Sequence, residues 1–452
     1  MRARRFANAV LITAAGFFAL LLVYLLAKGA PDTYPLATRV FVACVLVFLI
    51  VSLRGPVRYK VNCSLAIMSL GGSLLLAQMA LSFISFYTPP VLSGPSVDTR
   101  PIHQVIKDLG DAGFDAHPVM TLGIFRNRNL GELNVGGVVP LGSIANTTSI
   151  LCNELGYFLI YESDEHGFHN PQGIWGQERI DIVTIGDSFV HGVCVHSEEN
   201  PTALIRNVYP NTLNLGSAGT GPLTHLAIIK EYLPELKPRR VLWFYWEGDD
   251  LSNQTDEYNL LPTLRRYLEA NYRQDLASKQ GIIDEGLRLI ADRELTFPRE
   301  APPPRERRSV RIVRETITLY ELRLRLLTAI RHLRGCEVIP GEPLRLFDRI
   351  LRDANDLVSS WGGELYFVYL PDWERYTRFA ISFEQQRVGY KCYDQVMSIA
   401  NDIGLPVIDV AKAFEAHPDP HSLWPNGGIV HYDEEGYALV AKTVLQALEV
   451  EN

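Results

Sequence analysis

The residues best suited to chemistry are Gly186-Asp187-Ser188, which follow the most strand-like run of the chain. Residues 180–185 are apolar and β-branched, as a buried parallel strand requires. A serine on a sharp turn from a strand into a helix has its hydroxyl raised above the sheet edge and its own N–H directed the same way. This geometry suits a nucleophile that also donates to its own oxyanion. The alternative is that Ser188 is an ordinary helix N-cap.

The chain after residue 180 alternates between strand-like and helical segments. The predicted strands are 180–185, 212–215, 240–245, 365–370 and 406–409, and the predicted helices are 222–235, 344–360, 384–402 and 434–449. This alternation predicts a parallel sheet that is covered on both faces. Ligands of such sheets bind just beyond the carboxyl ends of the strands, so the residues that follow each strand are the candidates for a site.

Three further groups follow strands in this way. A glycine-rich loop, 214–221, comes after the second strand, and the polar loop 247–253 comes after the third. His431 precedes the last helix and is the preferred base. His191 is the rival base, but one turn after Ser188 on a shared helix its ring would point past the hydroxyl.

This order of motifs resembles the SGNH (GDSL-type) hydrolase superfamily, over roughly 176–255 and 340–450. The matching segments are 186–189, 214–220, 248–250 and 431–437. The segment 152–171 also resembles the lead-in of some membrane-tethered members. The resemblance implies an α/β fold, a flavodoxin-like three-layer sandwich with a parallel sheet. We expect no cofactor and no metal, and the cysteine spacings fit no zinc site.

The resemblance also implies roles for single residues. Ser188 would be the nucleophile, His431 the general base, and the backbone N–H groups of Ser188 and Gly219 would donate to the oxyanion. Asp249 stands where the family usually has an asparagine donor, and an ionised carboxylate has no proton to give. Either Asp249 is protonated, or Asn253 substitutes for it, or the oxyanion hole uses backbone donors alone.

A second departure from the family lies upstream of His431. Gly428 occupies the position, three residues before the histidine, where the family usually has an acid. The base would then be oriented by a backbone carbonyl or by a distant acid such as Asp419.

Beyond the fourth strand, Tyr369, Trp373 and Arg375 are candidates for a sugar subsite because aromatic rings stack on sugars. The alternative is that they are ordinary loop residues.

The first ninety residues are a membrane region with three predicted transmembrane helices. The spans are 6–27, 40–53 and 61–87. The alternative for the first is a cleaved signal peptide. Basic residues before the first span and between the second and third belong in the cytoplasm, which places everything after about residue 90 outside. These basic residues are Arg2, Arg4, Arg5, Arg54, Arg58 and Lys60.

The part outside the membrane has two predicted regions. Residues 91–175 form an irregular lead-in packed on a catalytic domain, 176–452, which has a helical insertion at about 256–340 with an exposed loop, 298–314. The net charge of −8 gives no sign of a nucleic-acid surface. In an oxidising compartment we predict a Cys152–Cys194 disulfide.

Together these features predict a bacterial inner-membrane protein with a periplasmic or other extracytoplasmic catalytic domain. Its expected activity is that of an esterase or O-acyltransferase acting through a Ser188 acyl-enzyme. The expected partners are the membrane, an acylated glycan or acyl donor, and membrane proteins of polysaccharide biosynthesis. The alternatives are a non-catalytic glycan-binding or assembly subunit with a degenerate site and, third, a lipid-acting esterase.

Overall fold

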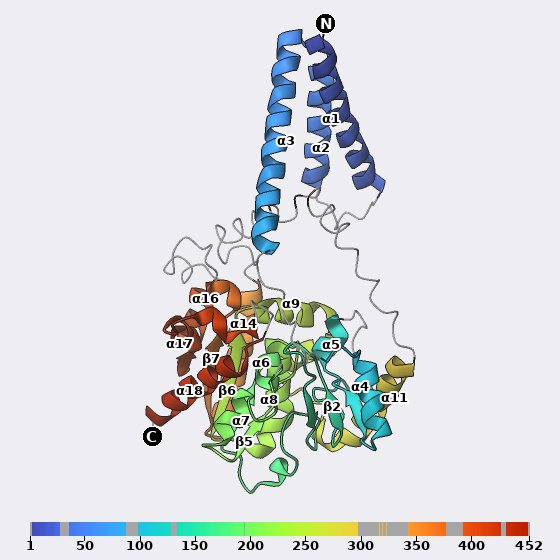
Figure 1. The fold of residues 1–452 in the computed structure, drawn as a ribbon. Helices are drawn as coiled ribbons and strands as arrows, with labels where there is room; N and C mark the ends of the chain where they lie inside the picture. Colours follow the sequence, from blue (N-terminus) through green and yellow to red (C-terminus); the bar gives the residue numbers. More distant parts are fainter. Residues whose placement is uncertain are drawn as a thin grey trace. The chain divides into compact units, whose positions relative to one another are not determined.

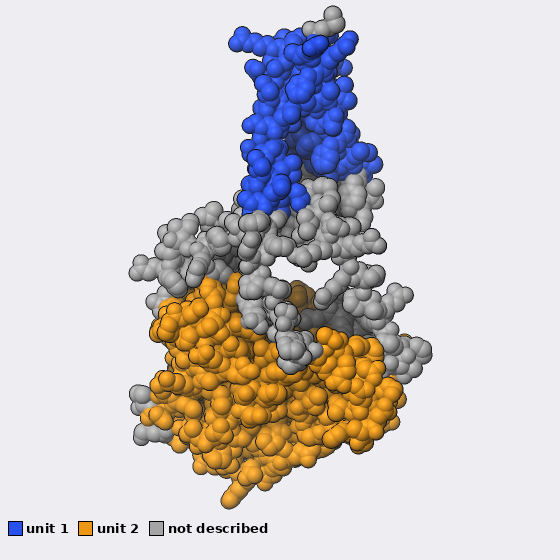
Figure 2. All heavy atoms as spheres, viewed as in Figure 1, with its two compact units in different colours: residues 1–87, 305–328 blue, residues 88–304, 329–452 orange. Residues whose placement is uncertain are grey.

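The protein forms two compact units in a computed structural model, residues 1–87 with 305–328 and residues 88–304 with 329–452 (Figure 2). The structure describes residues 2–27, 36–86, 98–127, 133–193, 195–296, 316, 319, 322, 342–376, 392–425 and 431–450. The predicted exposed loop, 298–314, and the glycine at position 428 lie outside these residues.

The first unit contains three apolar helices, α1 (Arg2–Ala27), α2 (Leu36–Ser52) and α3 (Val57–Phe86), which pack on one another (Figure 1). The Ser64 hydroxyl of α3 donates to the Ala7 carbonyl of α1 at 3.1 Å. Two helical segments are long and apolar enough to cross a membrane, Arg2–Val23 and Val57–Ala80. The third, Arg39–Ser52, is shorter, so the structure supports two of the three predicted spans.

The second unit is built on a parallel sheet of five strands. In spatial order these are β5 (Thr212–Asn214), β4 (Ile182–Ile185), β6 (Arg240–Trp246), β7 (Glu364–Leu370) and β8 (Val407–Asp409). Counted along the chain this order is 2-1-3-4-5, which is the flavodoxin-like order. The predicted fold class is therefore confirmed, and each predicted strand overlaps an observed one.

Helices cover both faces of this sheet because its strands are apolar on both sides. All seven residues of β6 are buried, and alternate residues enter two separate cores. Val241, Trp243 and Tyr245 pack with one set of helices, and Leu242 and Phe244 pack with the other. The first set is α8 (Pro222–Leu236), α14 (Glu342–Ser359) and α16 (Tyr393–Ile403), and the second includes α7 (Pro201–Arg206), α17 (Val410–Glu415) and α18 (Glu434–Val450).

The lead-in is more regular than predicted. It contains α4 (Ile102–Asp111), α5 (Leu122–Asn127) and a second sheet of β1 (Ala116–Pro118), β2 (Thr148–Ile150) and β3 (Ile160–Glu162). β1 is parallel to β2, and β2 is antiparallel to β3. Each of these strands has three residues, which is too short for an alternating pattern to stand out in the sequence.

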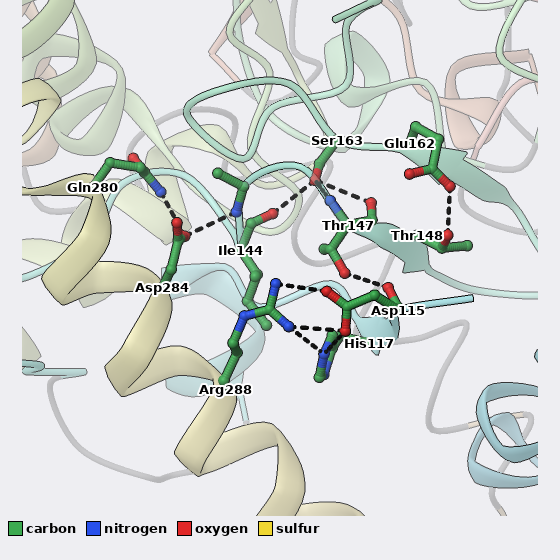
Figure 3. A network of polar contacts seen from close by, with 11 residues as sticks. Asp115, His117, Ile144, Thr147, Thr148, Glu162, Ser163, Gln280, Asp284 and Arg288 are labelled. Atoms are coloured by element: carbon green, nitrogen blue, oxygen red, sulfur yellow. Dashed lines mark hydrogen bonds and ion pairs between the residues drawn. The ribbon is translucent and has the colours of Figure 1, made fainter. Parts of the chain in front are cut away.

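The insertion packs against the lead-in through its longest described helix, α11 (Gln280–Thr296). Figure 3 shows the polar contacts: Arg288 pairs with Asp115 at 2.7 Å and donates to the His117 ring at 2.9 Å. Asp284 of the same helix accepts from the Ala145 N–H at 2.9 Å.

The remaining short elements are α6 (Ser188–His191), α9 (Asp250–Leu260), α10 (Pro262–Arg265), η1 (Ile174–Gly176), η2 (Arg266–Leu268), η3 (Ala277–Lys279), η5 (Trp373–Tyr376) and η6 (Pro420–Leu423).

Candidate active site

The turn between β4 and α6 holds Ser188 at the carboxyl edge of the sheet. Asp187 caps the short helix by accepting the Phe189 N–H at 3.0 Å. A side chain at Gly186 would place its Cβ 2.6 Å from Val190 Cγ2, so the tight turn requires glycine here. The Ser188 side chain is nearly buried, at 9% exposure, and its oxygen faces a histidine from the other end of the domain.

His431 and Ser188 are in direct hydrogen-bond contact. His431 Nε2 lies 2.7 Å from Ser188 Oγ, and its Nδ1 lies 2.9 Å from Glu154 Oε2. A serine, a histidine and an acid in this series can act as nucleophile, base and orienting group. The Phe189 ring packs 5.1 Å from the imidazole, centroid to centroid, and supports it from the side.

Glu154 is the residue that the sequence reasoning missed. Its carboxylate takes the position that was assigned to a backbone carbonyl or to Asp419. Asp419 is exposed and stands at the N-cap of η6 without a side-chain cap hydrogen bond, and the acid on His431 Nδ1 is Glu154 instead. Glu154 lies in the lead-in segment that carried part of the family resemblance, but it precedes His431 by 277 residues and follows no strand of the main sheet.

His191 is excluded as the base by its surroundings. It is buried, and its Nε2 lies 2.8 Å from the Tyr161 hydroxyl instead of facing Ser188. Burial lowers the pKa of His191 to about 3, with further lowering by the neighbouring His169 and His431. The ring is therefore neutral and forms part of the packing behind the nucleophile turn.

Two backbone N–H groups beside the nucleophile are available to an oxyanion. Within the described residues, neither the Ser188 N–H nor the Gly219 N–H has an acceptor. The loop that carries Gly219 crosses directly behind the turn, since the Ser217 N–H donates to the Gly186 carbonyl at 2.9 Å. Gly219 has φ of 74°, a conformation that glycine adopts without strain.

Asp249 lies beside this loop but is engaged as an acceptor. Asn253 Nδ2 donates to Asp249 Oδ1 at 2.7 Å and to the Thr220 carbonyl at 3.3 Å. Asn253 Oδ1 in turn accepts from Arg126 Nη2 at 2.7 Å. Both amide hydrogens of Asn253 are thus used, and Asn253 does not replace the missing donor in this geometry.

Asp187, Asp249 and Asp250 form a cluster of acids, each offering one carboxylate oxygen within 4.8 Å of the others. Burial, and then the charge of Asp249, raise the pKa of Asp187 to about 8. Burial, followed by the charges of Asp187 and Asp249, also raises the pKa of Asp250 well above its usual value. Both shifts favour the protonated form of these two carboxyl groups. The cluster is also the only set of acids, histidines and cysteines in the described part of the chain that could hold a metal ion.

The predicted sugar subsite is not formed as expected. Tyr369 and Arg375 are buried, at 0% and 2% exposure, and cannot stack on a surface sugar. Arg375 Nε donates to Glu247 Oε1 at 2.8 Å, and the Tyr369 hydroxyl bonds the other oxygen of the same carboxylate. Trp373 is half-buried and packs against His421, 5.3 Å between ring centroids.

The cysteine pairing also differs from the prediction. Cys152 is not disulfide-bonded, so the proposed Cys152–Cys194 bridge is wrong, and Cys194 itself lies outside the described residues. Cys392, at the start of α16, is disulfide-bonded. The lead-in is therefore held to the main domain by hydrogen bonds and packing at this point, including the Glu154–His431 contact.

No family model and no curated protein matches this chain. Several solved structures that match it carry names of lipolytic or hydrolytic enzymes. A protein named as lipolytic and of the G-D-S-L family from Desulfitobacterium hafniense is 14% identical, covering 60% of this chain and 99% of that one at a TM-score of 0.32. LAE5, an alpha/beta hydrolase from the Lake Arreo metagenome, is also 14% identical, covering 63% of this chain and 100% of that one at 0.32. A lipase/acylhydrolase from Enterococcus faecalis is 13% identical. The match covers 60% of this chain and 96% of that one at a TM-score of 0.31.

Proposed function

We propose that this protein is a serine esterase or O-acyltransferase of the SGNH type that acts through a Ser188 acyl-enzyme. The observation that carries the proposal is the series of contacts from Ser188 Oγ to His431 Nε2 and from His431 Nδ1 to Glu154, at 2.7 and 2.9 Å. The motif order at the edge of a flavodoxin-like sheet supports the same reaction.

The proposed reaction begins with attack of Ser188 Oγ on the carbonyl carbon of an acyl ester. His431 Nε2 takes the hydroxyl proton, and Glu154 stabilises the imidazolium through Nδ1–H. The carbonyl oxygen becomes an oxyanion, which accepts from the N–H groups of Ser188 and Gly219. When the carbonyl re-forms, the bond to the alcohol breaks and His431 returns the proton to the departing alkoxide.

The acyl group then passes from Ser188 to a second acceptor. His431 removes a proton from water or from a sugar hydroxyl, whose oxygen attacks the acyl carbon. The bond from that carbon to Ser188 Oγ then breaks, and His431 returns the proton to Ser188 Oγ. Water as the acceptor makes the protein an esterase, and a sugar hydroxyl makes it an acyltransferase. The two outcomes share every protein group and differ only in which acceptor reaches the acyl carbon.

The apolar helices and the disulfide support a location outside the cytoplasm. Disulfides persist in oxidising compartments, and Cys392 is in one. The basic residues in the first turns of α1 and those near the start of α3 belong on the cytoplasmic side, which requires α2 to cross as well. With 17 residues, α2 is at the lower limit of about 17–25 residues that span a bilayer.

A membrane-anchored enzyme of this kind suits a substrate that is assembled at the membrane. We therefore propose an acylated surface polysaccharide as the substrate or product, with membrane proteins of polysaccharide biosynthesis as partners. The apolar helices hold the catalytic unit near such assembly, and neither a cofactor nor a metal takes part in the proposed chemistry.

The deciding experiment is treatment of the detergent-solubilised full chain with a fluorophosphonate probe. Ser188 should displace fluoride and gain the phosphonyl group, which intact mass and peptide mapping detect. Ser188→Ala and His431→Ala should not be labelled. If the wild-type protein stays unlabelled and hydrolyses no activated ester, a non-catalytic glycan-binding function replaces the enzymatic one. The carboxylate of Asp249, in place of an asparagine donor, agrees with that alternative.

A further inference from the structure

The loop that carries Gly219 is held by side chains of the lead-in, which is not part of the nucleophile or base motifs. The Thr121 hydroxyl donates to the Ala218 carbonyl at 2.7 Å. Arg126 Nη2 donates to the Gly219 carbonyl at 2.9 Å. Both side chains are buried, at 3% and 7% exposure.

The Thr121 bond fixes the direction of the Gly219 N–H. In a planar trans peptide the carbonyl and the N–H point in opposite directions. Because the Ala218 carbonyl points toward Thr121, the Gly219 N–H points away from the lead-in. The next peptide is fixed as well, since its carbonyl bonds Arg126 and its Thr220 N–H returns to the Ser217 carbonyl at 3.3 Å.

The loop needs such anchors because its own backbone is permissive. Gly219 flanks the 218–219 peptide and lacks a side chain, and a glycine beside a peptide lets that peptide rotate at little cost. Rotation of the 218–219 peptide would turn the Gly219 N–H away and present the Ala218 carbonyl oxygen to a developing oxyanion. A carbonyl oxygen in that place would repel the charge that the N–H should stabilise.

The lead-in is shaped to reach this loop. A Cβ at Gly123 would lie 2.2 Å from both the carbonyl carbon and the carbonyl oxygen of Gly219, so only glycine lets α5 lie this close. The Thr121 hydroxyl also accepts the Ile124 N–H at 3.3 Å, which caps α5 and fixes the direction of the hydroxyl. The two ends of α5 thus present Thr121 and Arg126 to consecutive carbonyls.

We propose that Thr121 and Arg126 are positioning residues that hold the Gly219 N–H in the oxyanion hole. Arg126 also orients Asn253, the donor to Asp249, so it fixes the Asp249 side chain at the same time. The proposal rests on the proposed function, because only an acyl transfer through Ser188 creates the oxyanion. It makes the lead-in a part of the catalytic machinery that sequence motifs alone do not identify.

The test compares Thr121→Val with Thr121→Ser in the detergent-solubilised full chain. Valine keeps the shape of threonine but removes the hydroxyl, whereas serine keeps it. With p-nitrophenyl acetate we expect Thr121→Val to lower kcat at least about tenfold with KM nearly unchanged, and Thr121→Ser to restore most of the loss. Arg126→Met should lower kcat in the same way, and Arg126→Lys only partly restore it, because lysine lacks the planar fork.

A trifluoromethyl ketone separates positioning from a merely structural role. Its adduct with Ser188 places an oxyanion in the hole, so its Ki should rise in proportion to the loss of kcat. Thr147→Val is the matched control. Thr147 is a buried lead-in threonine whose hydroxyl bonds the Asp115 carbonyl, away from the site, and its replacement should leave kcat and Ki unchanged.

The outcomes separate the two proposals. If the wild-type chain reacts with fluorophosphonate but Thr121→Val and Arg126→Met keep wild-type kcat and Ki, the positioning role is refuted and the Ser188 enzyme stands. A fall in kcat that serine does not restore, with Ki unchanged, also refutes it. If the wild-type chain reacts with no probe and no ester, both proposals fall together.

Discussion

At the scale of single residues, the site joins parts of the chain that lie far apart in sequence. Ser188 follows a strand of the main sheet, His431 precedes the last helix, and Glu154 comes from the lead-in. The acid is partly exposed, with a side-chain exposure of 22%, and touches the imidazole at the nitrogen opposite to the one that faces Ser188. An acid in this place fixes the tautomer that lets Nε2 accept a proton.

Glu154→Gln should lower kcat roughly 10²- to 10⁴-fold on an activated ester, because a neutral amide neither fixes the tautomer nor stabilises the imidazolium. Glutamine has nearly the same size, so folding and KM should change little. Steady-state kinetics on the purified full chain measure the effect. Glu434→Gln is the matched control, since the Glu434 carboxylate accepts a hydrogen bond from the Tyr157 hydroxyl of the lead-in at 3.4 Å. Wild-type kcat in Glu154→Gln would remove Glu154 from the mechanism.

Asp249→Asn should raise esterase activity tenfold or more, about 1.4 kcal/mol in the barrier. Asn253 Nδ2 donates to Asp249 Oδ1, so an asparagine here would be held by its oxygen and would present its NH₂ group as the missing donor. Ser188→Ala in that background should abolish the gain. If Asp249→Asn lowers activity instead, Asp249 acts as a protonated donor in the wild-type protein.

The same substitution has a pH signature. Burial and the charge of Asp249 raise the pKa of Asp187 to about 8, so Asp187 is protonated below that pH and ionised above it. Wild-type activity should therefore fall as the pH rises through about 8, when a second negative charge forms beside the oxyanion. Asp249→Asn removes the neighbouring charge and should move this fall to lower pH. A wild-type profile that stays flat from pH 7 to 10 would contradict the assignment.

At the scale of elements, the strands were predictable and the lead-in was not. Residues 180–185 and 240–245 are continuous apolar runs, because strands buried on both faces carry no polar alternation. The three-residue strands of the lead-in give no such signal. The same limit hid Glu154, Thr121 and Arg126, since each acts through a tertiary contact with a loop far along the chain.

Arg375 shows the converse error, in which a polar residue after a strand was read as a ligand group. Glu247 directly follows β6, and its buried carboxylate accepts from Arg375 Nε at 2.8 Å and from the Asp372 N–H at 2.7 Å. The pair ties the loops that follow β6 and β7 to each other. Sequence reasoning could place both residues at the sheet edge, but not decide whether they face each other or a ligand.

Glu247→Gln should lower the free energy of unfolding by roughly 3–5 kcal/mol, because it leaves the buried Arg375 guanidinium without its charge partner. Thermal unfolding of the solubilised full chain measures the effect. Asp348→Asn breaks the exposed pair with Arg352 within α14 and serves as the control, for which no measurable change is expected. Equal melting temperatures for Glu247→Gln and wild type would show that the buried pair contributes little.

At the scale of the whole molecule, the compartment of the catalytic unit depends on whether α2 crosses the membrane. The apolar part of α2, Arg39–Ser52, is the shortest of the three apolar segments. Arg2–Val23 and Val57–Ala80 are each long enough to cross a membrane. Two crossings would return the second unit to the side of the N-terminus, and three would place it on the opposite side. The Cys392 disulfide agrees with three crossings and an oxidising compartment.

Reporter fusions on either side of α2 decide between these topologies. We expect a fusion at residue 57 to report the cytoplasm, and fusions at residue 32 and after residue 90 to report the outside. The basic residues in the first turns of α1 and near the start of α3 should stay in the cytoplasm. Each site is tested with two reporters. Alkaline phosphatase is active only outside the cytoplasm, and green fluorescent protein fluoresces inside it. If residues 32 and 57 report the same side, α2 does not cross. The catalytic unit would then face the cytoplasm, where an extracytoplasmic polysaccharide is out of reach and a stable disulfide at Cys392 is not expected.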